Sequence, residues 1–320
     1  MDLQIKHFLF RTSAFCSMFL IITIITFLFY RLIISQNKSI FKIDKSCNIL
    51  ILGDSHTECA LNDSLFSSAV NISSSADAYF YSYLKMKKFI ENNLQINTII
   101  LGFGYHDLGF SLEEWTYGDK FILEKIPKYF FLMNGKEILQ VFKFNPRLAP
   151  GLIPEIYRSA FKLTIKSILG NNYKQVGFGS YLNLLYNKLE EDIQRLKKEK
   201  NRDVIKFNYS PTQVKYLLLI SDFCKKHNIR LILLSTPIYK NLRQNYKNIK
   251  EYYYIFYKKY LSNNTLLDFS NLNLSDSSYA DCEHLNYLGA RDFSKFVNNK
   301  IAFMLKNENK IVEWLKSKHS

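Results

Sequence analysis

The chain carries, at residues 47–56, the sequence Cys47-Asn48-Ile49-Leu50-Ile51-Leu52-Gly53-Asp54-Ser55-His56. Its four consecutive apolar residues, 49–52, predict a short strand that is buried on both faces, as in a parallel sheet. Gly53-Asp54-Ser55 follows at once, so that a serine stands at the carboxyl end of the strand, where open α/β sheets form their sites. The stretch therefore predicts a serine nucleophile held at the end of a buried strand.

The rest of the chain alternates between apolar runs and stretches of helical spacing. We expect further strands over 70–72, 98–102, 229–235 and 265–268, and helices over 77–93, 211–227 and 286–305. Continuous apolar strands joined by helices indicate a parallel sheet covered on both faces. The predicted fold class is α/β: three layers, α/β/α, with a parallel five-stranded sheet as in flavodoxin, preceded by one N-terminal transmembrane helix and carrying a helical insertion.

The alternation fails between about 108 and 207. This segment is aromatic and basic and ends in a charged helical run over 189–202. It is predicted to be an insertion over the strand ends, either a lid or substrate-binding cap or inert padding. We therefore divide the chain into an N-terminal transmembrane anchor (1–34), a linker (35–46), the domain that would hold the site (47–305) and a C-terminal tail (306–320).

The N-terminal segment from Ser13 to Tyr30 contains no charged residue. With Leu32-Ile33-Ile34 beyond Arg31, it reaches the roughly 20 residues that a membrane helix needs. No pair of small residues marks a cleavage site behind it, so we expect an uncleaved single-pass anchor rather than a cleaved signal peptide or a buried core helix. Basic residues flank both ends, and the positive-inside rule leaves the orientation open.

The chain of 320 residues contains 48% hydrophobic residues, enough for a substantial core, and has a net charge of +15. A basic surface attracts nucleic acid, anionic lipid or acidic glycans. Without a zinc knuckle, a helix-turn-helix or an Arg-rich patch, we expect no nucleic-acid partner. No H-E-x-x-H, Gly-rich phosphate loop or C-x-x-C pair is present, so we predict no cofactor and no metal. Cys59 and Cys282 flank the expected site; two buried thiols are favoured over a disulfide.

Far downstream, Asp281-Cys282-Glu283-His284 places an acid and a histidine three residues apart. A serine hydroxyl attacks poorly until a base takes its proton. His284 is the expected base, and Asp281 would orient its ring and stabilise the imidazolium. The backbone N–H of Ser55 is a candidate donor to the oxyanion that forms after attack. The alternative is that Ser55 merely caps a helix and that Asp281 and His284 are an ordinary loop pair.

These motifs resemble those of the SGNH (GDSL-type) hydrolase superfamily, whose four blocks would fall at 53–56, 71–77, 104–107 and 281–284. Two blocks depart from the family pattern. Residues 71–77 lack the usual glycine, and His106 stands where the family usually has asparagine, although a histidine N–H can also donate to an oxyanion. The residues that the resemblance implies are Ser55, Asp281 and His284 for catalysis, and Ser55, Ser75, Gly104 and His106 for oxyanion or substrate binding.

With the expected anchor, the chain resembles membrane-anchored SGNH-like proteins that modify bacterial surface polymers. The resemblance implies a body outside the cytoplasmic membrane, an acyl group carried on Ser55, a cell-envelope glycan or acyl ester as substrate, and a multi-pass membrane acyltransferase as partner. The first hypothesis is acyl or acetyl transfer to or from such a glycan. The alternatives are a simple carbohydrate or lipid esterase, and a non-catalytic membrane-tethered scaffold or glycan-binding protein.

Overall fold

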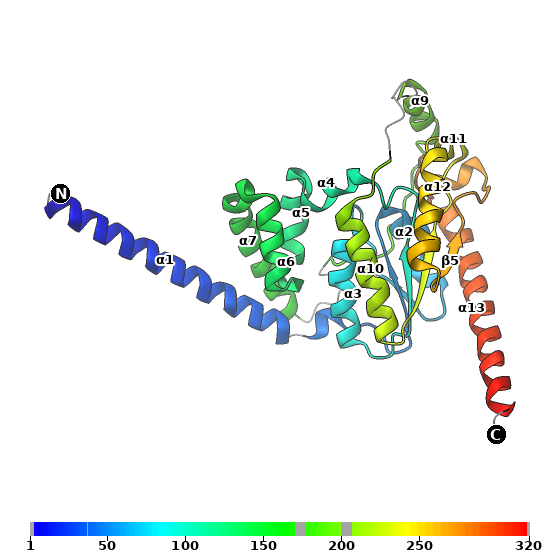
Figure 1. Ribbon diagram of the computed structural model, residues 1–320, viewed down its shortest axis with the longest axis horizontal. Coiled ribbons are helices and arrows are strands. Elements are labelled where there is room, and N and C mark those ends of the chain that lie inside the picture. Colours follow the sequence, from blue (N-terminus) through cyan, green and yellow to red (C-terminus); the bar gives the residue numbers. More distant parts are fainter. Residues whose placement is uncertain (1–2, 37, 170–173, 175–176, 200–206, 319–320) are drawn as a thin grey trace.

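The computed structural model describes residues 3–36, 38–169, 174, 177–199 and 207–318. A parallel five-stranded sheet with the order β2-β1-β3-β4-β5 forms its centre (Figure 1). The strands are β1 (Ile49–Leu52), β2 (Ala69–Asn71), β3 (Thr98–Gly102), β4 (Arg230–Ser235) and β5 (Thr265–Asp268). Each lies within a residue of its predicted range, and the predicted fold class is confirmed.

The chain leaves β1 for β2 on one side and later returns to place β3 on the other side. Ile51 of β1 accordingly pairs with Asn71 of β2 and with Ile100 of β3. Such a reversal of strand order opens a crevice at the carboxyl ends of the two central strands. Any site in this fold is therefore expected where β1 and β3 end.

Side chains of each strand alternate between the two faces of the sheet because successive residues point to opposite sides. Leu50 and Leu52 pack with α3 (Tyr79–Asn92), α10 (Pro211–Lys226) and α12 (Lys247–Phe256) in one core. Ile49 and Ile51 pack in a second core with the C-terminal helix α13 (Tyr287–Lys318). Figure 1 shows the sheet between α3 and α10 on one side and α13 on the other. Both faces are covered, which explains why the strands are apolar throughout.

Seven further helices lie in the described parts of the sheet domain and the insertion. They are α2 (Ser55–Ala60), α4 (Glu113–Tyr117), α5 (Asp119–Tyr129), α6 (Gly135–Phe144), α7 (Ala149–Ile168), α9 (Leu189–Glu199) and α11 (Lys240–Arg243). Short 3-10 or π turns lie at Lys38–Phe41, Asp63–Leu65, Phe110–Leu112, Phe130–Leu132, Pro146–Leu148, Tyr257–Leu261 and Asp276–Ser278.

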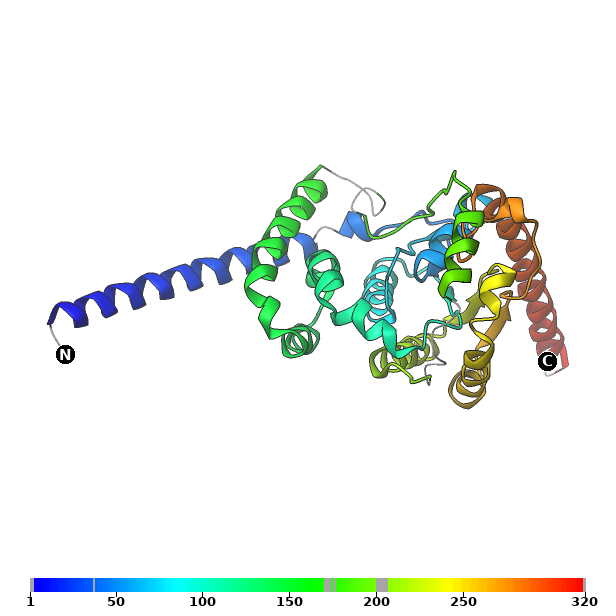
Figure 2. The ribbon, with the colours of Figure 1, turned by 90° about the horizontal axis from the view of Figure 1, so that it is seen from above.

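The predicted insertion, 108–207, contains α4 to α9, and its residues 170–173, 175–176 and 200–206 lie outside the described residues. Helices α5, α6 and α7 form a helical group that we call the cap; it lies between the sheet domain and the first helix (Figures 1 and 2). The closing helix, expected over 286–305, continues to Lys318, so that the predicted tail is helical as far as it is described.

The N-terminal helix α1 (Leu3–Gln36) projects away from the sheet domain (Figure 1). It begins ten residues before the expected apolar segment. Its apolar window reaches a mean hydropathy of 2.3 and is almost entirely exposed. A helix of this length and composition suits a single-pass membrane anchor or a signal sequence. Because it is exposed, it is not the core helix of a soluble domain.

Candidate active site

A sharp turn between β1 and α2 presents Ser55. Gly53 has φ +147°, and a Cβ there would lie 2.3 Å from Thr57 Oγ1, so the turn needs glycine. Asp54 caps α2, and its side chain accepts a hydrogen bond from the N–H of His56 at 2.9 Å. Ser55 is the first residue of the helix, and its own N–H therefore has no acceptor within the helix. The nucleophile predicted from the sequence thus stands at a helix N-terminus with a donor beside it.

The structure brings the three predicted catalytic residues together. Ser55 Oγ lies 2.9 Å from His284 Nε2, and His284 Nδ1 lies 3.0 Å and 3.1 Å from the two oxygens of Asp281. In this network the serine hydroxyl donates to Nε2 while the Nδ1–H donates to the carboxylate, which sets the imidazole tautomer. The arrangement is that of a nucleophile, a base and an orienting acid.

The loop around His284 is held by its own backbone. Asp281 Oδ1 accepts from the N–H groups of Glu283 and His284, both at 2.8 Å. Asn286 Oδ1 accepts from the N–H of Leu288 at 3.0 Å and so caps α13. These bonds explain why Asp-x-x-His, three residues apart, can turn both side chains towards Ser55.

The electrostatics of the pair agree with this arrangement. Burial disfavours the charged form of His284, but the hydrogen bond and charge of Asp281 outweigh it and raise the pKa of His284 above its ordinary value. Burial likewise opposes the charge on Asp281, yet the bond from His284 lowers the pKa of Asp281. The acid is therefore ionised, and a carboxylate in this position would stabilise an imidazolium on His284.

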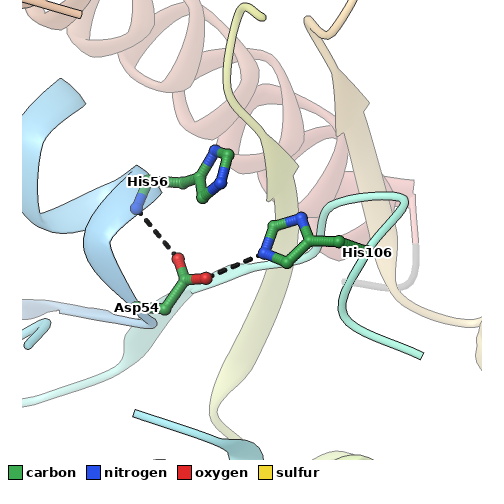
Figure 3. Close-up of side chains that lie close together, drawn as sticks. All are labelled: Asp54, His56 and His106. Atoms are coloured by element: carbon green, nitrogen blue, oxygen red, sulfur yellow. Dashed lines mark hydrogen bonds and ion pairs between the residues drawn. The ribbon is translucent and has the colours of Figure 1, made fainter. Parts of the chain in front are cut away.

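A second histidine cluster lies against the triad (Figure 3). His106 Nε2 contacts Asp54 Oδ2 at 2.8 Å and Asp107 Oδ1 at 3.1 Å. The ring of His56 stacks on that of His106 at 4.4 Å and lies 5.1 Å from that of His284. Burial opposes a charge on His106, but the carboxylates of Asp107 and Asp54 raise its pKa to about 10. His106 is therefore a half-buried cation, and the ring of His56 lies between it and the ring of His284.

The neighbours of His106 respond to its charge. Burial, and then the charge on His106, lower the pKa of His56 to about 3, so its ring is neutral. Burial raises the pKa of Asp107 to about 6. Asp54 stays ionised because its contacts with His56 and His106 outweigh its burial. The result is a row of three imidazoles in which the neutral ring of His56 separates the charged ring of His106 from that of His284.

The other predicted oxyanion donors have different partners in this structure. Gly104 N–H donates to Asp107 Oδ2 at 2.5 Å, and His106 Nε2 is bonded to Asp54. Ser75 Oγ donates to Glu58 Oε2 at 2.5 Å. The oxyanion roles of Ser55, Ser75, Gly104 and His106 stay predictions, and among these residues the N–H of Ser55 lies at the N-terminus of α2.

Two buried lysines hold the loop after β2, residues 72–77, through ion pairs and hydrogen bonds. Lys85 Nζ lies 2.6 Å from Asp77 Oδ2 and donates to the carbonyl of Ile72 at 2.5 Å. Lys125, from cap helix α5, lies 2.8 Å from Asp77 Oδ1 and also donates to the carbonyl of Ser75. Because α3 and α5 hold the same carboxylate, the position of this loop depends on the cap.

Residues 180–188 cross the site as an extended segment that we call the strap. Leu182 N–H donates to the carbonyl of Glu58 on α2 at 2.9 Å, and Lys188 N–H donates to that of Ala280 at 2.6 Å. The strap thus joins the helix of the nucleophile to the loop of the base. Beside it lies an open cleft of about 500 Å³. Residues lining the cleft include Tyr186, Lys188, Glu191, Arg195, Asp281 and Glu283.

Two overlapping groups of side chains have the donor types that zinc accepts. They are Asp54, His56 and His106, and His56, Glu283 and His284. The same atoms already make hydrogen bonds, since His106 Nε2 holds Asp54 and His284 Nε2 holds Ser55. In the first group the rings of His56 and His106 are stacked face to face. A metal ion bound by both rings would instead lie in the plane of each ring. In both groups, therefore, one histidine nitrogen already has a hydrogen-bond partner. Cys59 and Cys282, near the site, are both free and buried.

Comparisons with known proteins add little to this geometry. A family model for a domain of unknown function matches residues 178–306, a segment that holds Asp281 and His284 but not Ser55. No curated protein matches the chain. One similar solved structure is described as a candidate platelet activating factor from Streptococcus pneumonia; it is 12% identical, over 84% of this chain and 90% of that one, with a TM-score of 0.37. A likeness this distant carries no functional information.

Sequence reasoning assigned no role to His56, Lys85 or Lys125. His56 follows the nucleophile directly, but nothing local shows that its ring meets those of His106 and His284. The lysines stand in helical patterns that predict ordinary solvated positions, and only the packing of α5 onto α3 turns them inward. Their contacts join residues far apart in the chain, which periodicity does not report.

Proposed function

We propose that this chain is a serine-dependent acyl-ester enzyme of the SGNH type that carries the acyl group on Ser55. The observation that supports it is the hydrogen-bonded series from Ser55 Oγ through His284 to Asp281, with distances of 2.9 Å and 3.0 Å. A helix cap or a loop pair alone would not align three side chains at the carboxyl ends of the strands.

In the proposed reaction, His284 Nε2 takes the hydroxyl proton as Ser55 Oγ bonds to the acyl carbon. The N–H of Ser55 donates to the oxyanion, and Asp281 stabilises the imidazolium. His284 then gives its proton to the leaving oxygen, and the acyl-serine forms. An acceptor hydroxyl or water reverses these steps: it loses its proton to His284 and takes the acyl group from Ser55.

The acceptor we propose is a cell-envelope glycan, with the chain anchored in the cytoplasmic membrane and its body outside the cytoplasm. The polar, charged lining of the cleft beside Asp281 supports a polyhydroxylated acceptor over a lipid tail. The resemblance to anchored polymer-modifying proteins supports transfer and a multi-pass acyltransferase as acyl donor. The second candidate is hydrolysis of carbohydrate or lipid esters, in which water replaces the glycan.

The test uses the full chain in detergent with p-nitrophenyl acetate, beside Ser55→Ala and the matched control Ser64→Ala, an exposed serine in the turn before β2. We expect an acetyl adduct on the wild type and on the control but not on Ser55→Ala, and a rate loss of about three orders of magnitude or more in that variant. An adduct that persists in Ser55→Ala, or no Ser55-dependent turnover with acetyl or longer acyl esters, would contradict the proposal. Added glycans then separate transfer from hydrolysis, because only transfer acylates the sugar.

A further inference from the structure

Helix α7 of the cap has two apolar faces, and only one of them is covered by protein. Leu152, Ile156, Ala160 and Leu163 are buried against the cap. A second stripe follows the same helical spacing on the neighbouring face and is exposed. It consists of Ile153 (46% exposed), Phe161 (55%), Ile165 (41%), Ile168 (71%) and Leu169 (70%). Apolar side chains at this spacing form one continuous surface along a helix.

This stripe continues the face by which α7 touches α1. Tyr157, between Ile153 and Phe161 on the stripe, donates from its hydroxyl to the carbonyl of Thr23, and its ring lies 6.4 Å from that of Tyr30. An apolar notch of about 170 Å³ lies between the two helices. It is lined by Thr23, Ile24, Phe27, Phe130, Phe142, Ile153, Ile156 and Tyr157. The exposed stripe is therefore joined to the exposed surface of the membrane-anchor candidate.

The contact also sets where a bilayer would lie. Side chains of α1 from Leu3 to Ile22 are exposed, and partial burial begins at Thr23. The uncharged segment from Ser13 to Tyr30, with Leu32-Ile33-Ile34, has about 20 residues and is roughly 30 Å long, the thickness of the hydrocarbon core, so the contact from Thr23 to Tyr30 lies between the middle of this segment and its C-terminal end. Figure 2 shows α7 running across α1 rather than along it. If the uncharged segment of α1 crosses a bilayer, α7 lies beside the half of that segment that faces the sheet domain.

A row of basic residues borders the stripe. Arg158, Lys162 and Lys166 each follow a stripe residue by one position, at a spacing of four. Arg158 is 66% exposed and pairs with Glu155 at 3.3 Å. The three basic residues and this one acid have a formal charge of +2 together. An apolar stripe beside basic residues is the pattern of helices that lie in the interface of anionic membranes.

We propose that α7 is an interfacial helix, which seats the cap on an anionic lipid bilayer through the stripe Ile153–Phe161–Ile165–Ile168–Leu169. The inference rests on α1 being a membrane anchor and is independent of the proposed chemistry at Ser55. Seating the cap fixes how far from the membrane the strand ends lie. Because α5 of the same cap holds the loop after β2, the bilayer would also steady that loop.

The test places one tryptophan at a time in the full chain, in nanodiscs that contain phosphatidylglycerol brominated on its acyl chains. The native Trp115 and Trp314 are first replaced by phenylalanine. Phe161→Trp probes the stripe. Phe303→Trp on α13 is the matched control, with 63% exposure against 55% at Phe161, and Phe19→Trp on α1 (65% exposed) reports insertion of the anchor. Bromine quenches only an indole that reaches the acyl region.

We expect loss of emission in Phe161→Trp and Phe19→Trp and no loss in Phe303→Trp. Quenching in Phe19→Trp without quenching in Phe161→Trp would overturn the proposal and would leave a second protein as the cover of the stripe. Equal quenching of the Phe303→Trp control would overturn it as well, because contact would not be specific to α7. No quenching in Phe19→Trp would overturn the anchor and the inference together. Equal quenching in brominated phosphatidylcholine would overturn the requirement for anionic lipid. None of these outcomes bears on acylation of Ser55.

Discussion

Ser55 is held at the N-terminus of α2 because its two preceding residues make the turn. Gly53 adopts a φ that other residues rarely reach, and Asp54 caps the helix while it binds His106. The adjacent His284 is then tuned by Asp281. The site is a set of titratable side chains whose neighbours raise the pKa of some and lower the pKa of others. Shifted pKa values of this kind are characteristic of catalytic centres.

The raised pKa of His284 leads to a prediction for the pH dependence of the rate. The base must be neutral to take the serine proton, and its imidazolium is stabilised by Asp281, so its pKa lies above 6.5. We expect kcat/KM for an acyl ester to rise with pH, with an apparent pKa above 6.5. In Asp281→Asn the rise of kcat/KM with pH should occur at lower pH, and the maximal kcat/KM at high pH should fall by several orders of magnitude. An apparent pKa below 6.5 in the wild type would contradict this account.

The half-buried cation at His106 predicts how stability depends on pH. Its folded-state pKa of about 10 exceeds the ordinary value of 6.5, so its contribution is complete below pH 6.5 and is lost as pH rises towards 10. The difference in unfolding free energy between the wild type and His106→Gln, measured by urea titration in detergent, should therefore be largest near pH 6 and shrink towards pH 10. A difference that widens with rising pH would show that His106 is neutral in the folded protein.

At the scale of elements, the cap and the sheet domain share one ionic cluster. Asp77 stands on the loop after β2, Lys85 on α3 and Lys125 on α5, and all three side chains are almost fully buried. The strap makes a second connection, between α2 and the loop of His284. Together, α3, α5 and the strap therefore fix the relative positions of Ser55, His284 and the loop after β2.

Removing the shared carboxylate should destabilise the protein strongly. In Asp77→Asn two buried ammonium groups lose their partner, which costs about 3–5 kcal/mol of unfolding free energy. The exposed pair of Arg291 and Asp292 offers a matched control: Asp292→Asn should change the unfolding free energy by no more than about 0.5 kcal/mol. Urea unfolding of both variants in detergent provides the comparison. Equal effects would mean that the cluster does not hold the loop.

At the scale of the molecule, two cores share one sheet, and the strands at its centre are the most protected part of the chain. All five residues of β3 are buried, and β3 pairs with both β1 and β4. The cap adds a helical body on one side, and α1 extends beyond it (Figure 1). Stability is therefore expected to decrease from the central strands outward.

Native-state hydrogen exchange measures this gradient directly. Amides of β1, β3 and β4 should exchange slowest, because they open only when the sheet domain unfolds. Amides of the edge strands β2 and β5 should exchange faster, and those of the strap faster still, since few backbone bonds hold it. Equal protection across the strap and β3 would contradict this order.

The strands, three of the helices that cover them (α3, α10 and α13) and the residues Ser55, Asp281 and His284 could be predicted from the sequence, whereas α12 was not predicted. The strand at Ile49–Leu52 can be recognised from four consecutive apolar residues. Asp281 and His284 face one way because of a local turn. Both signals lie within a few residues of the chain. Tertiary packing alone places His56 between His106 and His284, turns Lys85 and Lys125 inward to Asp77, and leaves one apolar face of α7 uncovered. Each of these depends on which segments meet in space, and a pattern along the chain encodes the shape of an element but not the surface it packs against.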